Sequence, residues 1–529
     1  MPVRKWLTVA VVALAVVVAA VAAKRGARAV GGADSYGYAS QAEGWLRGDV
    51  LPHQRFLEAQ TDRPVTQWIF APLGWKPSKV NSDLVPSYAP GYPMLMAGFK
   101  AAFGHAAIFW IVPLSSGLLI WATYLTGCRL GRPVEGAIAA LFVASSATVL
   151  YMSMVPMSDV PSAALWTFML SLALGRSRAS ALGAGAVAAL AILVRPNLLM
   201  LGVLVGIWLA ANDLRAHRLR LWRGRAWLFA LVSAAGIAGV AVMNARWYGR
   251  ASESGYGDLG GLFSVGHVAP NAARYASWLV QSDTALAAGF LLVAVLPAWI
   301  NRRRDVAGVP ALLVAWLAWI VGMYLAYLVF DAWWFLRFVL PAFPLMAIGA
   351  ASAVTWSWQR GGVLRAAAAL AVAAAVASSV SFAHRNQAFE IGRTESRYPQ
   401  IARAVATIAP PQSAIITLQH SGTVRYYGGR MTVRWDVIFP REFGAMVAWL
   451  RAHGHHPYLL LDVGELADAR KRFAGDPAFT PATWPAAVSF FHGETLLFDL
   501  DAPGPPRPTG FATYSRQAFE PVPLDQWIR

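Results

Sequence analysis

Residues 6–23 read WLTVAVVALAVVVAAVAA, an apolar run without a charged side chain, and GGADSYGY follows at 31–38. An α-helix needs about 20 apolar residues to cross a bilayer, so this run predicts a membrane span with Asp34 just beyond its end. The sequence PMSDVP at 156–161 repeats the pattern and places Asp159 after a second apolar run. A charge at membrane depth costs about 2.5 to 3.5 kcal/mol and is usually kept for function. Asp34 and Asp159 are therefore candidate catalytic residues.

The composition also places the chain in a bilayer. Its mean hydropathy is +0.46 and only 14% of its residues are charged, against roughly 25% in soluble domains. In a soluble protein the net charge of +18 would point to nucleic acid. Here many arginines stand in short loops between apolar runs, where they set topology and meet anionic lipid. Membrane lipids and not nucleic acid are the predicted partners, and the single Cys128 predicts no internal disulfide.

About eleven apolar runs are long enough to cross a membrane. They are 6–23, 106–126, 134–151, 160–174, 181–194, 198–211, 227–245, 285–300, 309–330, 336–356 and 366–382. Some fall short of the length that a perpendicular helix needs, notably the two that flank Arg195. We therefore predict a polytopic α-helical membrane domain over residues 1–383, with some helices tilted or beside a buried cavity.

The short loops predict the orientation. Arginines crowd the loops on one side, namely Arg129 and Arg132, Arg176 and Arg178, Arg215 through Arg225, Arg302 to Arg304, and Arg360 with Arg365. That side is cytoplasmic by the positive-inside rule, which also makes the N-terminus cytoplasmic. The basic residues at 24–28 disagree locally, but the later loops outnumber them. An alternative is that the first run is a cleaved signal peptide, although the repeated returns to the membrane favour an anchor.

This tracing puts three large segments outside, at 24–105, 248–283 and 384–529. In the last segment, residues 414–418, 431–435, 458–462 and 495–499 have the pattern of β-strands, and helical patterns occur at 398–408, 441–453 and 464–473. Strands alternating with helices predict a small α/β domain. We expect it outside the plasma membrane, on the same side as both aspartates.

Each aspartate has a structural alternative to catalysis. Residues Tyr38, Ala42 and Trp45 are spaced as on one face of a helix along the membrane surface, so Asp34 can be its N-cap or a general base beside its N-terminus. The position of Asp34 alone favours these two interpretations about equally. Asp159 has a similar alternative, because Ser158 or Asp159 can cap the helix that starts near Pro161.

Two arginines are candidates for binding a phosphate. Arg337 lies among aromatic residues at 331–341 and either extends to the membrane interface as an anchor or offers a fork of donors to a lipid phosphate. Arg195 has the same two possibilities. Lys76 and Lys79 in the first outer loop can reach a phosphate or solvent.

Other motifs are missing or weak. Histidines at 453, 455 and 456 have no acidic partner at fixed spacing and make a poor metal site. We find no phosphate-cradling P-loop, no nucleophile elbow and no cysteine-based metal motif in the sequence. No metal site is predicted from these residues.

Several short motifs occur in an order that a known family shares. After a first helix, a long outer loop opens with an acidic residue followed by Tyr. YAPGYP at 88–93 leads into the second helix, SDVP at 158–161 forms the second outer turn, and RFVLP at 337–341 comes near the end. Over about residues 1–382 the chain resembles GT-C fold glycosyltransferases, in particular the bacterial branch related to protein O-mannosyltransferases and lipid A aminoarabinose transferases.

The resemblance implies an enzyme of the bacterial plasma membrane. Such an enzyme moves a sugar, with inversion, from a polyprenyl-phosphate donor to a glycan, lipid or protein acceptor on the outer face. Asp34 then matches the family's base, Asp159 the acid that positions the acceptor or the first loop, and Arg337 the basic residue near the donor phosphate. No cofactor is expected. Several relatives carry two adjacent acids where this chain has Asp34 and Ser35, which leaves the use of a divalent metal and the choice of base open.

Two other functions remain as alternatives. A transporter or flippase of a polyprenyl-linked or amphipathic substrate would carry internal repeats and charges at mid-membrane, and the two halves show no clear repeat. A non-catalytic assembly protein would keep the fold and bind partners through its outer domain.

Overall fold

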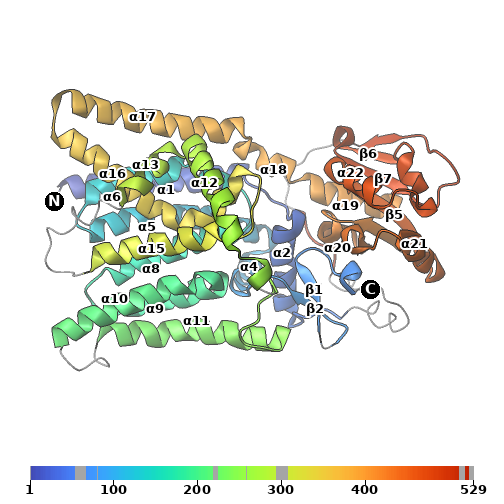
Figure 1. The fold of residues 1–529 in the computed structure, drawn as a ribbon, viewed down its shortest axis with the longest axis horizontal. Helices are drawn as coiled ribbons and strands as arrows, with labels where there is room; N and C mark the ends of the chain where they lie inside the picture. The colour runs from blue at the N-terminus through green and yellow to red at the C-terminus, as the bar shows by residue number, and fades with distance from the viewer. Residues whose placement is uncertain are drawn as a thin grey trace.

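The computed structural model describes residues 2–53, 67–79, 81–217, 224–257, 259–293, 308–511 and 519–523. A bundle of long helices forms one part of the molecule, and a mixed sheet with its own helices forms the other (Figure 1). The N-terminus lies at the far end of the bundle from the sheet. Between the two parts lies a layer of short elements made by the first outer loop.

The bundle contains the predicted apolar runs as helices. These are α1 (Pro2–Arg25), α5 (Ile111–Arg129), α6 (Pro133–Ser145), α7 (Ala147–Ser153), α8 (Asp159–Ala173), α9 (Arg178–Val194), α10 (Leu199–His217), α11 (Arg225–Tyr248), α13 (Thr284–Val293), α15 (Val309–Leu325), α16 (Phe343–Gln359) and α17 (Gly362–Arg385). The end of the predicted run at 285–300 lies outside the described residues. The helix α12 (Val268–Ser282) packs across this bundle against α13, α15 and α17.

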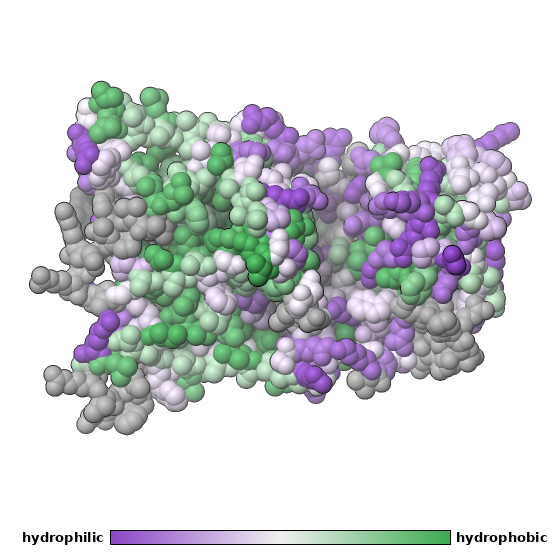
Figure 2. Space-filling view, viewed as in Figure 1, coloured by the Kyte–Doolittle hydropathy of each residue, from purple (hydrophilic) through white to green (hydrophobic). Residues whose placement is uncertain are grey.

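Six of the described helical segments are long and apolar enough to cross a membrane. A seventh results if α6 and α7, which meet at 60°, form one broken span. The apolar helices α9 and α15 are shorter, so the count of about eleven spans stays a prediction. The most apolar windows of α1 and α17 are only 22% and 17% buried. Figure 2 shows hydrophobic surface over the bundle and more hydrophilic surface over the sheet, a division suited to lipid around the bundle.

Prolines break the helices where the candidate arginines stand. Arg195 precedes Pro196, which disfavours helical geometry in the residue before it, and its φ and ψ of −148° and 84° end α9. Arg337 lies in the 3₁₀ helix η7 (Trp333–Ala342), which leads into α16. Pro341 follows Arg337 by four residues and cannot donate the α-helical hydrogen bond to its carbonyl. Both guanidinium groups therefore project from breaks in the helical backbone.

The C-terminal part is the predicted α/β domain. Its six-stranded sheet has the order β4-β3-β5-β7-β6-β8, with β4, β3 and β5 parallel to one another and β7 antiparallel to β5. The strands are β3 (Ser413–Thr417), β4 (Met431–Arg434), β5 (His456–Asp462), β6 (Val488–Phe490), β7 (Thr495–Asp499) and β8 (Thr509–Phe511), and the helices include α19 (Arg397–Ile408), α20 (Ser421–Gly428), α21 (Phe443–Ala452) and α22 (Val463–Arg472). All four predicted strands and all three predicted helices are present. The sequence analysis missed β6, β8 and α20.

The layer between the two parts is built on α2 (Gly32–Arg47), which packs on α4 (Gly91–Phe103). Beside them, β1 (Trp75–Pro77) and β2 (Leu84–Pro86) form an antiparallel pair. The sequence predicted a helix along the membrane surface with Tyr38, Ala42 and Trp45 on one face. The helix is present, but its burial is not confined to that face, because residues 35–44 are all buried. The reason is α20, which covers the second face with Gly422 against the ring of Tyr36.

Candidate active site

Asp34 lies in the first turn of α2, where two hydrogen bonds hold its carboxylate. Tyr88 donates its hydroxyl to Oδ1 at 2.6 Å, and Arg337 donates from Nη2 to Oδ2 at 3.2 Å. Burial, and after it the nearby Asp34 charge, raise the pKa of Tyr88 well above its ordinary value, so this phenol keeps its proton and remains a donor. The Asp34 side chain is still 30% exposed. A partner molecule can therefore reach it.

Neither aspartate is a helix cap. The N-cap of α2 is Gly31, in extended geometry, and that of α8 is Ser158, and neither makes a side-chain capping bond. Asp34 and Asp159 stand inside the first turn instead, where the partial positive charge of a helix N-terminus stabilises a carboxylate. The capping interpretation is thus wrong for Asp34 and Asp159, whereas Ser158, the other candidate for α8, holds the N-cap position without a side-chain capping bond.

Asp159 forms a second ion pair, deeper in the bundle. Arg195 donates from Nη2 to its Oδ1 at 2.8 Å, and the two side chains are 15% and 1% exposed, respectively. Asp159 Oδ2 and Arg195 Nη1 are buried without a hydrogen-bond partner among the described residues. A buried pair of this kind needs further hydrogen bonds to offset its desolvation, so the orphaned atoms mark a place for a polar ligand or water.

Tyrosines join the two ion pairs. Tyr38, one turn after Asp34, shares a hydrogen bond of 2.9 Å with Ser158, the neighbour of Asp159. Its ring packs on those of Tyr88 and Tyr92, with centroids 4.6 and 5.0 Å away. The two aspartates therefore stand at the same end of the bundle, as the sequence tracing required. Arg337 completes the connection, because its charge interacts with both carboxylates.

A cavity of about 260 Å³ opens beside Asp34 and Arg337. Its wall also includes Tyr151 and Trp334, whose rings stack with centroids 5.7 Å apart and planes 10° apart. The far wall belongs to the segment that leaves the bundle for the C-terminal domain, with Ile391, Thr394, Glu395 and Tyr398. The site is therefore shared between the two parts of the chain.

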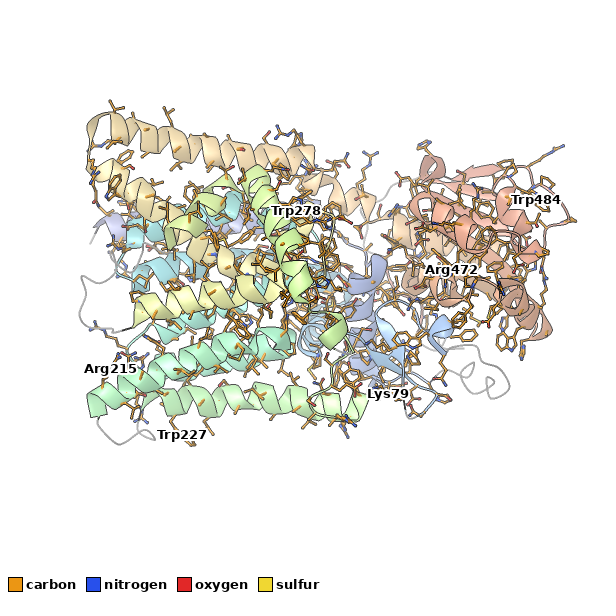
Figure 3. The ribbon with its side chains drawn as sticks, in the orientation of Figure 1. Lys79, Arg215, Trp227, Trp278, Arg472 and Trp484 are labelled. Atoms are coloured by element: carbon orange, nitrogen blue, oxygen red, sulfur yellow. The ribbon has the colours of Figure 1, made fainter. Side chains whose placement is uncertain are left out.

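A second, larger cavity of about 850 Å³ lies between the first outer loop and residues 247–257. It contains Lys76 and Lys79, and Lys79 forms an ion pair with Glu253. Figure 3 places Lys79 at the junction of the bundle and the sheet, far from Arg215 at the opposite end of the bundle. The two lysines thus line a cavity other than the one beside Asp34.

Two other acids of the first loop, Glu43 and Asp49, stand apart from the Asp34 cavity. Glu43 is buried in an ion pair of 2.7 Å with Lys100 and accepts a hydrogen bond from Tyr426 at 3.2 Å. Asp49 is exposed beyond the end of α2. Neither lines the cavity, and Asp34 is the acid of the first loop's described residues that does.

The histidines of the C-terminal domain have local partners. His453 and His455 hydrogen-bond to backbone carbonyls, and His456 Nε2 lies 2.7 Å from Asp499 Oδ1. Across the described part of the chain, no group of three or more His, Cys, Asp or Glu side chains is arranged to hold a metal ion. The use of a divalent metal therefore stays open.

The fold has known counterparts. ArnT from Cupriavidus metallidurans in the apo state aligns with a TM-score of 0.55 and 15% identity over 95% of this chain and 100% of ArnT. ArnT bound to undecaprenyl phosphate aligns with a TM-score of 0.57 and 15% identity over 95% of this chain and 99% of ArnT. The apo oligosaccharyltransferase of Archaeoglobus fulgidus aligns with a TM-score of 0.61 and 14% identity over 89% of this chain and 71% of the transferase. No family model and no curated protein sequence matches.

These neighbours are GT-C fold glycosyltransferases. The chain has that fold, as its motif order indicated.

Proposed function

We propose that the protein is a membrane glycosyltransferase that moves a sugar from a polyprenyl-phosphate donor to a hydroxyl group of an acceptor. The observation that carries the proposal is the carboxylate of Asp34, held between Tyr88 and Arg337 and open to a cavity where the bundle ends. The fold supports it, since it matches ArnT bound to undecaprenyl phosphate. A polyprenyl donor reaches such a site through the lipid, so no nucleotide-binding domain is required.

The reaction needs few groups. The acceptor oxygen attacks the anomeric carbon and loses its proton to Asp34, while the bond from that carbon to the phosphate oxygen breaks and the phosphate leaves with the electron pair. Transfer of the proton to a positioned carboxylate contributes about 10² to 10⁴ in rate. A single displacement of this kind inverts the anomeric configuration.

Arg337 is suited to the phosphate. Its Nη2 already reaches Asp34 at the cavity, and its Nε is buried without a partner among the described residues. A guanidinium offers phosphate a bidentate set of charge-assisted hydrogen bonds, which neutralise the charge that develops on the leaving group. Arg195 is the second candidate for binding the phosphate. Its guanidinium also forms an ion pair with Asp159, which holds the end of α9 in place.

The membrane topology and the division of the chain into two domains belong to the same proposal. We propose an N-terminus in the cytoplasm, about eleven spans within residues 1–383, and an extracytoplasmic domain at 384–529 in the bacterial plasma membrane. The acceptor is then a glycan, lipid or protein of the outer face. No observation on the fold or the site favours the transporter alternative.

The direct test uses the purified full-length protein in nanodiscs. It is supplied with undecaprenyl-phosphate-linked mannose, glucose or arabinose and with native membranes as the source of acceptor, and the release of undecaprenyl phosphate is measured. We expect release that depends on acceptor from at least one donor. If no donor is consumed, with or without acceptor, the proposed function is wrong.

A further inference from the structure

The segment that joins α17 to the C-terminal domain brings a second carboxylate to the active-site cavity. Glu395 lines this cavity together with Asp34 and Arg337, although 360 residues separate it from Asp34 in the sequence. Its Oε2 lies against the backbone of Gly31, where an added Cβ would come within 2.5 Å of that oxygen. The absence of a side chain at Gly31 lets the linking segment close over the start of α2.

The Glu395 carboxylate is available to a ligand. It accepts no hydrogen bond from any described residue, whereas both oxygens of Asp34 have donors. Burial raises the pKa of Glu395 to about 7, although the charge of Arg397 acts in the opposite direction. The side chain is only partly buried, and neither carboxylate oxygen is among the buried polar atoms that lack a partner, so a hydroxyl group in the cavity can reach it.

The segment that carries Glu395 is held in place by ion pairs of Arg397. Arg397, two positions later, lies 3.7 Å from Asp462 and 3.5 Å from Glu494. Burial raises the pKa of Asp462, but the hydrogen bond with His420 and the charge of Arg397 outweigh it and hold the value at about 2. Asp462 thus stays ionised and keeps Arg397 at the end of β5. The Arg397 charge has two carboxylate partners without Glu395, so Glu395 is not needed as its counter-ion.

We propose that Glu395 belongs to the acceptor subsite and that its carboxylate binds a hydroxyl group of a glycan acceptor; this inference rests on the proposed function. Carboxylate oxygens accept hydrogen bonds from sugar hydroxyls. The exposed ring of Trp334, stacked on Tyr151, offers an apolar surface in the same cavity for the C–H face of a sugar. Two carboxylates beside one arginine disfavour an anionic group at the acceptor position.

The acceptor dependence of the rate should therefore change with pH. The charged and titratable groups around Glu395 are Arg397, Asp462, Tyr151, Tyr398 and Tyr427, together with Asp34 and Arg337 across the cavity. Because its pKa is raised to about 7, Glu395 is protonated below about pH 7. Only above this pH does its charged carboxylate accept a hydrogen bond from a hydroxyl group of the glycan. The apparent KM for acceptor should rise as the pH falls through this value.

The test compares Glu395→Gln with wild type in the nanodisc assay, using native membranes and a set of methyl glycosides as acceptors. We expect the acceptor KM to rise about tenfold, the scale of one hydrogen bond to a charged group, and its change near pH 7 to disappear, while the donor KM stays within twofold. Glu494→Gln is the matched control, because it removes a partner of Arg397 outside the cavity, and it should behave as wild type.

Three results would count against these ideas in different ways. A wild-type enzyme that transfers sugar and a Glu395→Gln enzyme with the same acceptor KM and pH profile would overturn the inference alone. Equal changes in Glu395→Gln and Glu494→Gln would assign Glu395 to the support of Arg397 and also overturn it. If wild type releases no undecaprenyl phosphate from any donor, the proposed function fails and the inference fails with it.

Discussion

Arg337 reaches Asp34 across 303 residues of sequence and donates a hydrogen bond of 3.2 Å to its Oδ2. The two residues come from opposite ends of the bundle's chain, from the first turn of α2 and from a 3₁₀ helix that Pro341 enforces. Their contact places a carboxylate and a guanidinium at one cavity, and these are the two groups that the proposed transfer uses.

Asp34→Asn tests the carboxylate. The amide keeps nearly the same shape but cannot take a proton, so turnover should fall by about 10² or more. The N-cap of α2 is Gly31, and folded yield in detergent should therefore change little. Asp49→Asn, an exposed site past the end of the same helix, is the control and should keep full activity. Normal transfer by well-folded Asp34→Asn protein would exclude Asp34 as the base.

Arg337→Lys tests the phosphate contact. Lysine keeps the positive charge but loses the planar fork, so we expect a donor KM about tenfold higher, the scale of one charge-assisted hydrogen bond, with a smaller change in acceptor KM. Arg274→Lys is the control, since Arg274 pairs with the exposed Asp331 and lies outside the cavity. An unchanged donor KM in Arg337→Lys would exclude Arg337 from phosphate binding and leave it as the ion-pair partner of Asp34.

The Asp159–Arg195 pair should behave as a buried ion pair. Asp159→Leu leaves Arg195 charged and without its partner, and the loss of one member of such a pair costs about 3 to 5 kcal/mol. The double variant Asp159→Leu/Arg195→Met removes both charges and should regain much of that stability. Thermal unfolding of the three proteins in detergent measures the difference. A double variant less stable than Asp159→Leu alone would show that the two side chains do not act as a pair.

The sequence predicted the parts of the fold that local patterns determine. Apolar runs located the helices, and the strands β3, β4, β5 and β7 coincide with short runs of mostly apolar residues. It missed β6 and β8, which are three residues long, and α20, whose eight residues SGTVRYYG are a short stretch with two glycines. These elements depend on the neighbours that they pair with or cover.

At the candidate site, the sequence indicated the charged residues but not the contacts that they make. Asp34, Asp159, Arg195 and Arg337 stand out because charges are rare beside apolar runs. Nothing local indicated that Arg195 pairs with Asp159 or that Glu395 closes the cavity, since both contacts come from distant segments. The burial of α2 on two sides was likewise invisible, because the covering helix α20 lies almost 400 residues later.

Topology can be tested at two positions. A reporter that is active only outside the membrane, fused at Gln412, should be active, and the same reporter fused at Gly361 should be inactive, because Arg360 and Arg365 favour retention inside. A cytoplasmic reporter should give the reverse pattern. The same answer at both positions would contradict the tracing and the location of the site on the outer face.

Gly422 tests how closely the C-terminal domain must lie on α2. A Cβ at this position would overlap the ring of Tyr36, which is fully buried two residues after Asp34. Overpacking of this kind costs about 1 to 3 kcal/mol, so Gly422→Ala should lower the unfolding temperature. It should also slow transfer, because α20 must move away from the helix that carries Asp34.

Gly464→Ala is the matched control: it also lies in a helix of this domain, and a Cβ there meets no atom within 4 Å, so Ala should be neutral or slightly stabilising. Equal unfolding temperatures and rates for the two variants would show that the contact between α20 and α2 is not tight enough to matter.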